Sequence, residues 1–292
     1  MPLSAPPDLE STHEVLRREG VTLVVRRDWR AHLPVDELLR GAGLETWGRP
    51  LPDHGLVGRA QLHVLETPGG QLVAKALSRG GLLGNCLPDV SWDRWRPARE
   101  AALAERLSAL GVPTASVAVT RSTRVMGGLF RCEIATVRLP GAVDLLEALA
   151  GTPVDTWCAY ASALGRTLAR LHDVGLVHRD MQVKNLLVPA DLCADGLLAV
   201  IDLDGCQLTQ NLNGEARLKA LTRFARSLVK RGLLPGGGGR PQALPRAALR
   251  AFLGAYVLDH DGPWVGSRAA LLRQLSRRLS RQLAFHRLFW RQ

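Results

Sequence analysis

Short β-rich segments dominate the first half of the chain, and apolar residues at helical spacing dominate the second half. Strands are predicted, in chain order, at residues 21–25, 61–66, 71–77, 116–120 and 130–137. A helix is predicted over residues 98–110, where a proline precedes an Ala-, Leu- and Arg-rich run and Gly-Val-Pro ends it. This order predicts a strand-rich N-terminal lobe, residues 21–139, that carries one helix.

The second half of the chain is predicted to be mainly helical. Leu164, Leu168 and Leu171 fall at i, i+4 and i+7, which predicts a long amphipathic helix over residues 154–174 that ends near Gly175. The remaining predicted elements are strands at 185–188 and 197–203 and helices near 215 and 247, with a Pro- and Gly-rich loop at 235–241. The pattern therefore predicts an α+β fold whose C-terminal lobe covers residues 140–292, preceded by a flexible, Pro-rich segment over residues 1–20.

Length and composition restrict the class of protein. A chain of 292 residues that is 46% hydrophobic can bury one large core or two modest ones, which suits an enzyme of two lobes. The five cysteines are scattered without C-x-x-C spacing, which argues against a disulfide framework and against a zinc site. No apolar run approaches the roughly 18 residues of a spanning helix, and the N-terminal residues lack a secretory signal pattern. A cytoplasmic protein is expected.

The net charge of +11 favours a polyanionic partner, such as nucleic acid, a phosphorylated glycan or an anionic membrane surface. Aromatic residues make up only 5% of the chain and no recognised module occurs, so nucleic-acid binding is not expected. Residues 267–292 contain no acidic residue and combine seven arginines with leucines at i, i+4 spacing. This pattern predicts a helix that packs on the C-terminal lobe or lies on an anionic membrane surface, and the two outcomes are compatible.

The segment His178-Arg179-Asp180, followed by Asn185, is the strongest chemical signal. Phosphoryl transfer needs a carboxylate that orients and deprotonates the acceptor hydroxyl, and an amide oxygen a few residues later that helps to hold a metal ion. Asp180 is therefore predicted to be the catalytic aspartate and Asn185 a metal ligand. Lys184, inside the same loop, is predicted to contact the acceptor or the transferred phosphate, and a solvated surface lysine is the alternative.

Two further elements complete the predicted chemistry. Asp202 ends an apolar strand, where its carboxylate can bind a cation that bridges nucleotide phosphates, and Asp204 is the second candidate ligand. Upstream, Lys75 ends a strand and is predicted to hold nucleotide phosphates. Glu100, near the start of the next helix, is its predicted ion-pair partner, with Glu105 of the same helix as the alternative.

The order Lys, Glu, His-Arg-Asp…Asn and Ile-Asp over about residues 57–207 resembles the protein-kinase-like superfamily. The resemblance implies a two-lobed fold with a β-rich N-lobe and a mainly helical C-lobe, and it implies ATP and Mg²⁺ as cofactors. The glycine-rich loop is its poorest match, and only Gly58 is carried over as a nucleotide contact. No Ala-Pro-Glu follows Asp202 and nothing there resembles a long activation loop, which favours a kinase of small molecules or glycolipids over a regulated protein kinase.

A basic segment follows the lysine strand, Ser78-Arg79-Gly80-Gly81-Leu82-Leu83-Gly84-Asn85, and leads through two tryptophans to Glu100. This arrangement resembles bacterial lipopolysaccharide core kinases, which phosphorylate Kdo or heptose on lipid A cores. Residues 139–146, 211–218 and 226–228 are also similar to that family. Arg59, Arg79 and Lys184 are candidate contacts to an anionic core glycan.

The resemblance implies an ATP-dependent kinase that phosphorylates Kdo, or else heptose, of the lipopolysaccharide inner core. The acceptor would be the lipopolysaccharide core or a lipid A precursor, and the protein would lie peripherally on the cytoplasmic face of the inner membrane. Two alternatives stay open: a small-molecule phosphotransferase of the antibiotic-kinase type, and a catalytically inactive kinase-like binding module. The pattern of residues leaves the oligomeric state undetermined.

Overall fold

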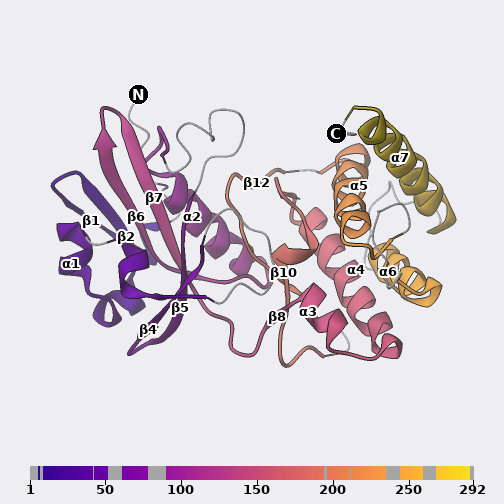
Figure 1. Cartoon of the computed structure of the whole chain (residues 1–292), viewed down its shortest axis with the longest axis horizontal. Coiled ribbons are helices and arrows are strands. Elements are labelled where there is room, and N and C mark those ends of the chain that lie inside the picture. The colour runs from indigo at the N-terminus through magenta and orange to yellow at the C-terminus, as the bar shows by residue number, and fades with distance from the viewer. Residues whose placement is uncertain are drawn as a thin grey trace. The chain divides into compact units, whose positions relative to one another are not determined.

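The structure is a computed structural model that describes residues 6, 9–41, 43–51, 61–77, 90–193, 196–210, 212–234, 244–258 and 268–289. The chain divides into two compact units (Figure 1). The N-terminal unit contains residues 1–109, 114–139 and 203–205, and the C-terminal unit contains residues 110–113, 140–202 and 206–292. The short segment Leu203–Gly205 therefore belongs to the N-terminal unit, although Asp202, its covalent neighbour, belongs to the C-terminal unit.

An antiparallel seven-stranded sheet forms the framework of the N-terminal unit (Figure 1). Its strands, in spatial order, are β1 (His13–Arg18), β2 (Val21–Arg26), β6 (Val117–Met126), β7 (Leu129–Val137), β5 (Gly70–Ala76), β4 (His63–Thr67) and β3 (Arg49–Pro50). The five strands predicted for this lobe are present, four of them within two residues of their predicted bounds. The strand predicted at 116–120 is longer than expected, because β6 continues to Met126.

The expectation of a flexible segment over residues 1–20 is wrong for residues 13–18. Strand β1 pairs with β2 along its whole length, from His13 opposite Arg26 to Arg18 opposite Val21. Glu19 and Gly20 both adopt positive φ angles, as the two-residue turn of a tight hairpin requires. The polar residues of β1 hid this strand from a pattern-based prediction.

Two helices pack on this sheet where the sequence predicts one. Helix α2 (Arg96–Ala109), the predicted helix, packs on β6 and β7, whereas α1 (Val35–Arg40) packs on β1 and β2. Two short 3₁₀ helices, η2 (Arg27–His32) and η3 (Leu44–Trp47), flank α1. Helix α1 has only six residues, too few to show a clear helical period, and the prediction of a single helix is corrected accordingly.

A buried ion pair fastens α1 and η3 to the sheet. Arg121 of β6 and Glu133 of β7 lie opposite each other, each is 3% exposed, and Arg121 Nη1 donates to Glu133 Oε2 at 2.7 Å. Arg121 Nε also donates to the carbonyl of Leu38 at 3.1 Å. Glu133 Oε1 accepts from the backbone N–H of Leu44 at 2.9 Å. Removal of either partner would leave a charge inside the fold.

The C-terminal unit combines helices with short strands. Its helices are α3 (Leu145–Ala150), α4 (Trp157–Asp173), α5 (Gly214–Lys230), α6 (Arg246–Leu258) and α7 (Arg268–Phe289), with 3₁₀ helices η5 (Val154–Thr156) and η6 (Val183–Asn185). Its strands are β8 (Val143–Asp144), β9 (Leu176–Val177), β10 (Leu186–Val188), β11 (Ala199–Val200) and β12 (Gln207–Leu208). Strand β10 pairs with β8 and β11, and β9 pairs with β12.

Close packing of α4 against α6 forms the centre of this unit. A Cβ atom on Gly165 would lie 2.4 Å from the carbonyl oxygen of Phe252, so only glycine permits this approach. Farther along, His172 Nδ1 and the buried Tyr256 hydroxyl are hydrogen-bonded at 2.8 Å. Helix α4 ends at Asp173, and Gly175, with a φ angle of +79°, reverses the chain toward β9, as the sequence predicts.

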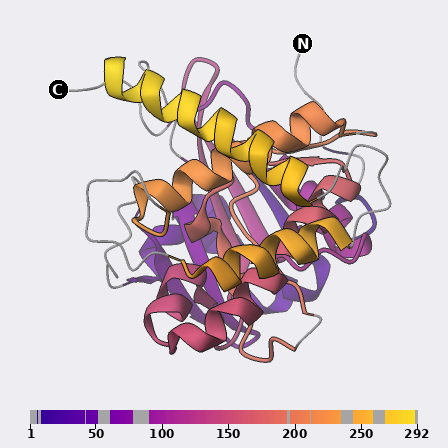
Figure 2. The same ribbon diagram turned by 90° about the vertical axis from the view of Figure 1, so that its right-hand side faces the viewer.

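The final helix, α7, lies across α5 and α6 (Figure 2). Leu271 is buried, and Arg278 forms an ion pair with Glu215 of α5. Arg273 and Arg277 are exposed. The predicted packing of this helix on its own lobe is therefore confirmed. Among the described residues, none of the helices combines the length and apolar character needed to cross a bilayer.

Glu133→Gln tests the buried pair, because it keeps the size of the side chain but leaves the Arg121 charge uncompensated. We expect the free energy of unfolding to fall by about 3–5 kcal/mol. Glu66→Gln is the matched control: it disrupts the exposed ion pair of Glu66 with Arg49 and should cost no more than about 1 kcal/mol. Urea denaturation measures both, and equal losses would contradict a special role for the buried pair.

Candidate active site

The predicted site residues are divided between the two units. Lys75, Glu100 and Asp204 belong to the N-terminal unit, and Asp180, Lys184, Asn185 and Asp202 belong to the C-terminal unit. Gly58, Arg59 and the segment from Arg79 to Gly81 lie outside the described residues.

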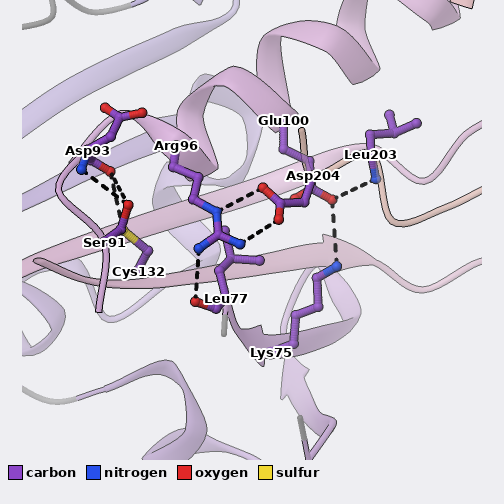
Figure 3. A network of polar contacts seen from close by, with 9 residues as sticks. All are labelled: Lys75, Leu77, Ser91, Asp93, Arg96, Glu100, Cys132, Leu203 and Asp204. Carbon is purple, nitrogen blue, oxygen red and sulfur yellow. Dashed lines mark hydrogen bonds and ion pairs between the residues drawn. The ribbon is translucent and has the colours of Figure 1, made fainter. Parts of the chain in front are cut away.

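Lys75 and Glu100 form the predicted ion pair in the N-terminal unit (Figure 3). Lys75 lies on β5, an internal strand between β7 and β4, and its Nζ is 3.7 Å from Glu100 Oε1. Glu100 comes from the first half of α2 and is 5% exposed. The prediction that an acidic residue of the helix holds the ammonium of the strand is confirmed for Glu100.

The same carboxylate oxygen binds the segment that follows Asp202. Glu100 Oε1 accepts the backbone N–H of Leu203 at 3.1 Å (Figure 3). This N–H belongs to the peptide bond between Asp202 and Leu203. Glu100 therefore connects three parts of the chain, β5, α2 and residues 203–205, through one buried atom.

Arg96 holds the same segment at a second point. Its Nε and Nη2 donate to the two carboxylate oxygens of Asp204 at 2.9 and 2.5 Å, and its Nη1 donates to the carbonyl of Leu77 at 3.3 Å (Figure 3). Arg96 and Glu100 are four residues apart on α2 and so lie on the same face of the helix. Sequence reasoning missed Arg96, because its i, i+4 spacing from Glu100 indicates a shared helix face but not its partner Asp204, 108 residues later.

In the C-terminal unit, the loop from His178 to Asn185 is fixed by its own polar groups. The Asn185 side chain is buried, and its Nδ2 donates to the backbone carbonyl of Asp180 at 2.8 Å. Asp180 itself is exposed, and its Oδ1 accepts from Gln182 Nε2 at 2.5 Å. Lys184 lies half-buried on η6 within the same loop. The candidate catalytic carboxylate is thus accessible while the loop that carries it is fixed.

His178 ties this loop to the strand that leads to Asp202. Its Nδ1 accepts the backbone N–H of Asp180 at 3.2 Å, and its Nε2 lies 3.3 Å from the carbonyl oxygen of Ile201, to which it donates. The N–H of Ile201 donates in turn to the carbonyl of Asn185 at 3.0 Å. The histidine can make both of its bonds only when neutral, and burial lowers its pKa below the ordinary value.

Helix α5 also binds this loop. Arg223 Nη1 donates to the backbone carbonyls of His178 and Arg179 at 3.2 and 3.1 Å. One turn later, Ser227 Oγ accepts the N–H of Val183 at 3.1 Å. Sequence reasoning missed Arg223, and only its i, i+4 spacing from Ser227 pointed to a shared role.

Asp202 and Asn185 have the right chemistry for a hard cation. The Nδ2 of Asn185 is used by the loop, so the amide oxygen is the atom available as a ligand, and Asp202 contributes carboxylate oxygens. Asp202 also has a φ angle of +62°, an uncommon conformation for a residue other than glycine and one that occurs often at functional sites. Within the described ranges no group of three or more His, Cys, Asp or Glu residues gathers around a common point. A site with only one or two protein ligands is typical of Mg²⁺, because this ion retains several water ligands and also binds the phosphates of the substrate.

Residues 55–256 match the model of the lipopolysaccharide kinase (Kdo/WaaP) family. The 3-deoxy-D-manno-octulosonic acid kinase of Photobacterium profundum is 33% identical over 159 residues, which are 52% of this chain and 62% of that protein. The enzyme of the same name from Xylella fastidiosa is 28% identical over 189 residues, 63% of this chain and 72% of its own length. The match to the Photobacterium protein thus spans less than two thirds of that relative.

A solved structure of WaaP in complex with acyl carrier protein has a similar fold, with a TM-score of 0.54. The match covers 89% of this chain and 98% of the WaaP chain, at 20% sequence identity. At that identity the likeness concerns the fold and not the activity. The predicted α+β, protein-kinase-like fold is confirmed.

The neutral, buried state of His178 predicts a pH dependence of stability. Because its pKa is lowered in the folded state, the unfolded chain binds more protons at pH values below the ordinary histidine pKa of about 6.5. The stability that neutral His178 provides is complete above that pH and is lost as the pH falls below it, by up to about 1.4 kcal/mol per pH unit. His178→Asn should therefore flatten the pH dependence of unfolding by urea.

His32→Asn, a substitution in the other unit, is the control and should keep the wild-type slope of stability against pH. If His178→Asn and wild type lose the same free energy between pH 7.5 and 5.5, His178 is not the group that titrates.

Proposed function

The chain belongs to the lipopolysaccharide kinase (Kdo/WaaP) family, and on this premise we propose that it transfers phosphate from ATP to a sugar of the lipopolysaccharide inner core. The observation that carries the proposal is that a chain of this family holds both an ion-paired Lys75 and a fixed loop that presents Asp180. The names of its relatives favour Kdo over heptose as the acceptor.

Asp180 is assigned the role of catalytic base. In the proposed reaction it accepts the proton of the sugar hydroxyl while the hydroxyl oxygen attacks the γ-phosphorus of ATP. The new O–P bond forms as the bond to the β,γ-bridging oxygen breaks, and ADP leaves. The exposure of Asp180 supports this role because an acceptor has to reach the carboxylate. Lys184 is assigned a contact to the acceptor or to the transferred phosphate.

ATP and Mg²⁺ are the proposed cofactors. Lys75 would hold the nucleotide phosphates, with its ammonium positioned by Glu100, and Gly58 is proposed as a further nucleotide contact. Asp202 and Asn185 would hold Mg²⁺, and the bound ion would supply positive charge next to the phosphates. Asp204 is assigned a positioning role instead, because both of its carboxylate oxygens accept from Arg96.

The proposed place of action is the cytoplasmic face of the inner membrane, where the acceptor would be a lipopolysaccharide core or lipid A precursor. Such an acceptor carries carboxylates and phosphates, which suits a chain with a net charge of +11. Helix α7 supports peripheral binding to anionic lipid. Its Leu271 is buried, whereas Arg273, Arg277 and Arg281 follow an exposed i, i+4 stripe.

Asp180→Asn tests the catalytic assignment, because the amide keeps the shape of the side chain but cannot accept the proton. We expect acceptor-dependent ADP release with a Kdo-containing lipid A precursor to fall by about 10²–10⁴-fold. Asp155→Asn, at an exposed aspartate of η5, is the control and should keep wild-type activity. Full activity of Asp180→Asn would remove Asp180 from the mechanism.

The same assay separates the alternatives. ADP release that depends on soluble alcohols but not on the lipid A precursor would identify a phosphotransferase of the antibiotic-kinase type. A folded protein that fails to bind Mg²⁺-ATP would identify a binding module without turnover.

A pair of variants tests the choice of metal ligand. Asp202→Asn should raise the Mg²⁺ concentration needed for half-maximal activity by about tenfold or more, because a charged oxygen ligand is lost. Asp204→Asn should lower the maximal rate without that shift, because it weakens the bond to Arg96 and not the cation site. Titration of activity with Mg²⁺ measures both, and a larger shift in Asp204→Asn would reverse the assignment.

A further inference from the structure

The most exposed apolar side chains of the described residues gather at one end of the N-terminal sheet. Met126 is 71% exposed, Trp92 64% and Val125 54%, whereas no other large hydrophobic side chain in the described part of the chain exceeds 41%. Exposed apolar side chains are common singly, but a cluster of the largest ones marks an interaction surface. We name Trp92, Val125 and Met126 the hairpin patch.

The hairpin patch lies where the β6–β7 hairpin extends past its neighbouring strands. On one side, the pairing of β6 with β2 ends at Thr123, and the N–H of the next residue, Arg124, donates to the carbonyl of Gly20. On the other side, the last backbone bond toward β5 that involves described residues runs from the N–H of Leu77 to the carbonyl of Cys132. Among the described strands, the turn at Gly127 and Gly128 therefore extends beyond β2 and β5.

Trp92 packs beside this projecting turn. Its neighbour Ser91 exchanges two backbone hydrogen bonds with Phe130 of β7, at 2.7 and 2.8 Å. A Cβ atom placed on Gly128 would lie 3.9 Å from the Trp92 ring, which is ordinary contact. Trp92 therefore lies next to the turn that follows Val125 and Met126, although it comes from the chain segment before α2.

The chain segments around the hairpin patch are basic. Residues 17–22, 91–95 and 123–131 contain five arginines, namely Arg17, Arg18, Arg94, Arg124 and Arg131. They contain two carboxylates, Glu19 and Asp93, and each of these forms an ion pair with an arginine. The guanidinium groups of Arg17 and Arg94 both lie over the ring of Trp95, at 5.5 and 5.1 Å from its centroid. A partner of negative charge is therefore favoured.

We propose that the hairpin patch inserts into the headgroup region of an anionic lipid bilayer while the surrounding arginines bind lipid phosphates. A projecting turn fits a flat bilayer surface, and Trp is enriched at the membrane–water interface because its ring is apolar with one polar N–H. The surplus of arginines supplies the charge complementarity. This surface belongs to the N-terminal unit, does not involve α7, and does not depend on which acceptor the chain phosphorylates.

Vesicle flotation tests the apolar part of the proposal. Full-length Val125→Ser/Met126→Ser should partition onto phosphatidylglycerol-containing vesicles about tenfold more weakly than wild type. Leu110→Ser/Val154→Ser is the matched control: it removes two exposed apolar side chains from the other unit and should partition as wild type. Unchanged partitioning of the hairpin variant, with its fold intact by circular dichroism, overturns the proposal. That outcome is also expected if the patch instead covers another protein.

A second pair of measurements tests charge and placement. Arg124→Gln/Arg131→Gln should weaken binding at low salt by about 25-fold, or about fivefold per charge, and binding to phosphatidylcholine vesicles alone should be weak. Brominated lipids should quench tryptophan fluorescence in wild type more than in Trp92→Phe. Equal quenching, or equal binding to neutral and anionic vesicles, contradicts insertion at this patch.

Activity on a deacylated, water-soluble acceptor should stay at the wild-type level in all these variants, which separates this surface from the active site.

Discussion

One buried carboxylate oxygen, Oε1 of Glu100, determines the arrangement of the N-terminal half of the candidate site. It lies within ion-pair distance of the Lys75 ammonium and accepts the N–H of Leu203. A buried carboxylate is stable only with such partners, so α2, β5 and the segment after Asp202 have to keep their places together. Arg96 adds a second attachment one turn earlier on the same helix. The position of the lysine and the position of the chain next to Asp202 are thereby coupled.

In the C-terminal unit, a different helix holds the segment that carries the candidate catalytic residue. There α5 uses Arg223 and Ser227, again four residues apart, to bind backbone groups of the catalytic loop. His178 and Asn185 then fix the backbone of Ile201, the residue before Asp202. In each unit, two side chains one turn apart on a helix bind the segment beside the candidate site. In the N-terminal unit Arg96 and Glu100 of α2 bind residues 203 and 204, and in the C-terminal unit Arg223 and Ser227 of α5 bind the loop that carries Asp180. Hydrogen bonds to the backbone fix the positions of the candidate catalytic groups, and accurate positioning of reacting groups is itself a large contribution to catalysis.

The sequence was informative where function is encoded over short distances. Strands β2, β4, β5, β6 and β7, the end of α4 near Gly175 and the pairing of Lys75 with Glu100 followed from local pattern and from the spacing of a known motif order. The bond between Arg96 and Asp204 joins residues 108 positions apart, and no local pattern reveals such a partner. Strand β1 was missed because its polar residues hide the alternation, and α1 because it is short. The polar contacts between residues far apart in the sequence are thus the features of the site that only the three-dimensional structure reveals.

If this chain phosphorylates a sugar of the lipopolysaccharide inner core, the phosphate content of that core depends on it. The measurement is mass spectrometry of core oligosaccharide from the source organism, with the gene deleted and with the intact gene restored. We expect the loss of one phosphate from Kdo in the deletion strain and its return on complementation. A core whose sugars carry the same phosphates in the two strains would contradict this expectation.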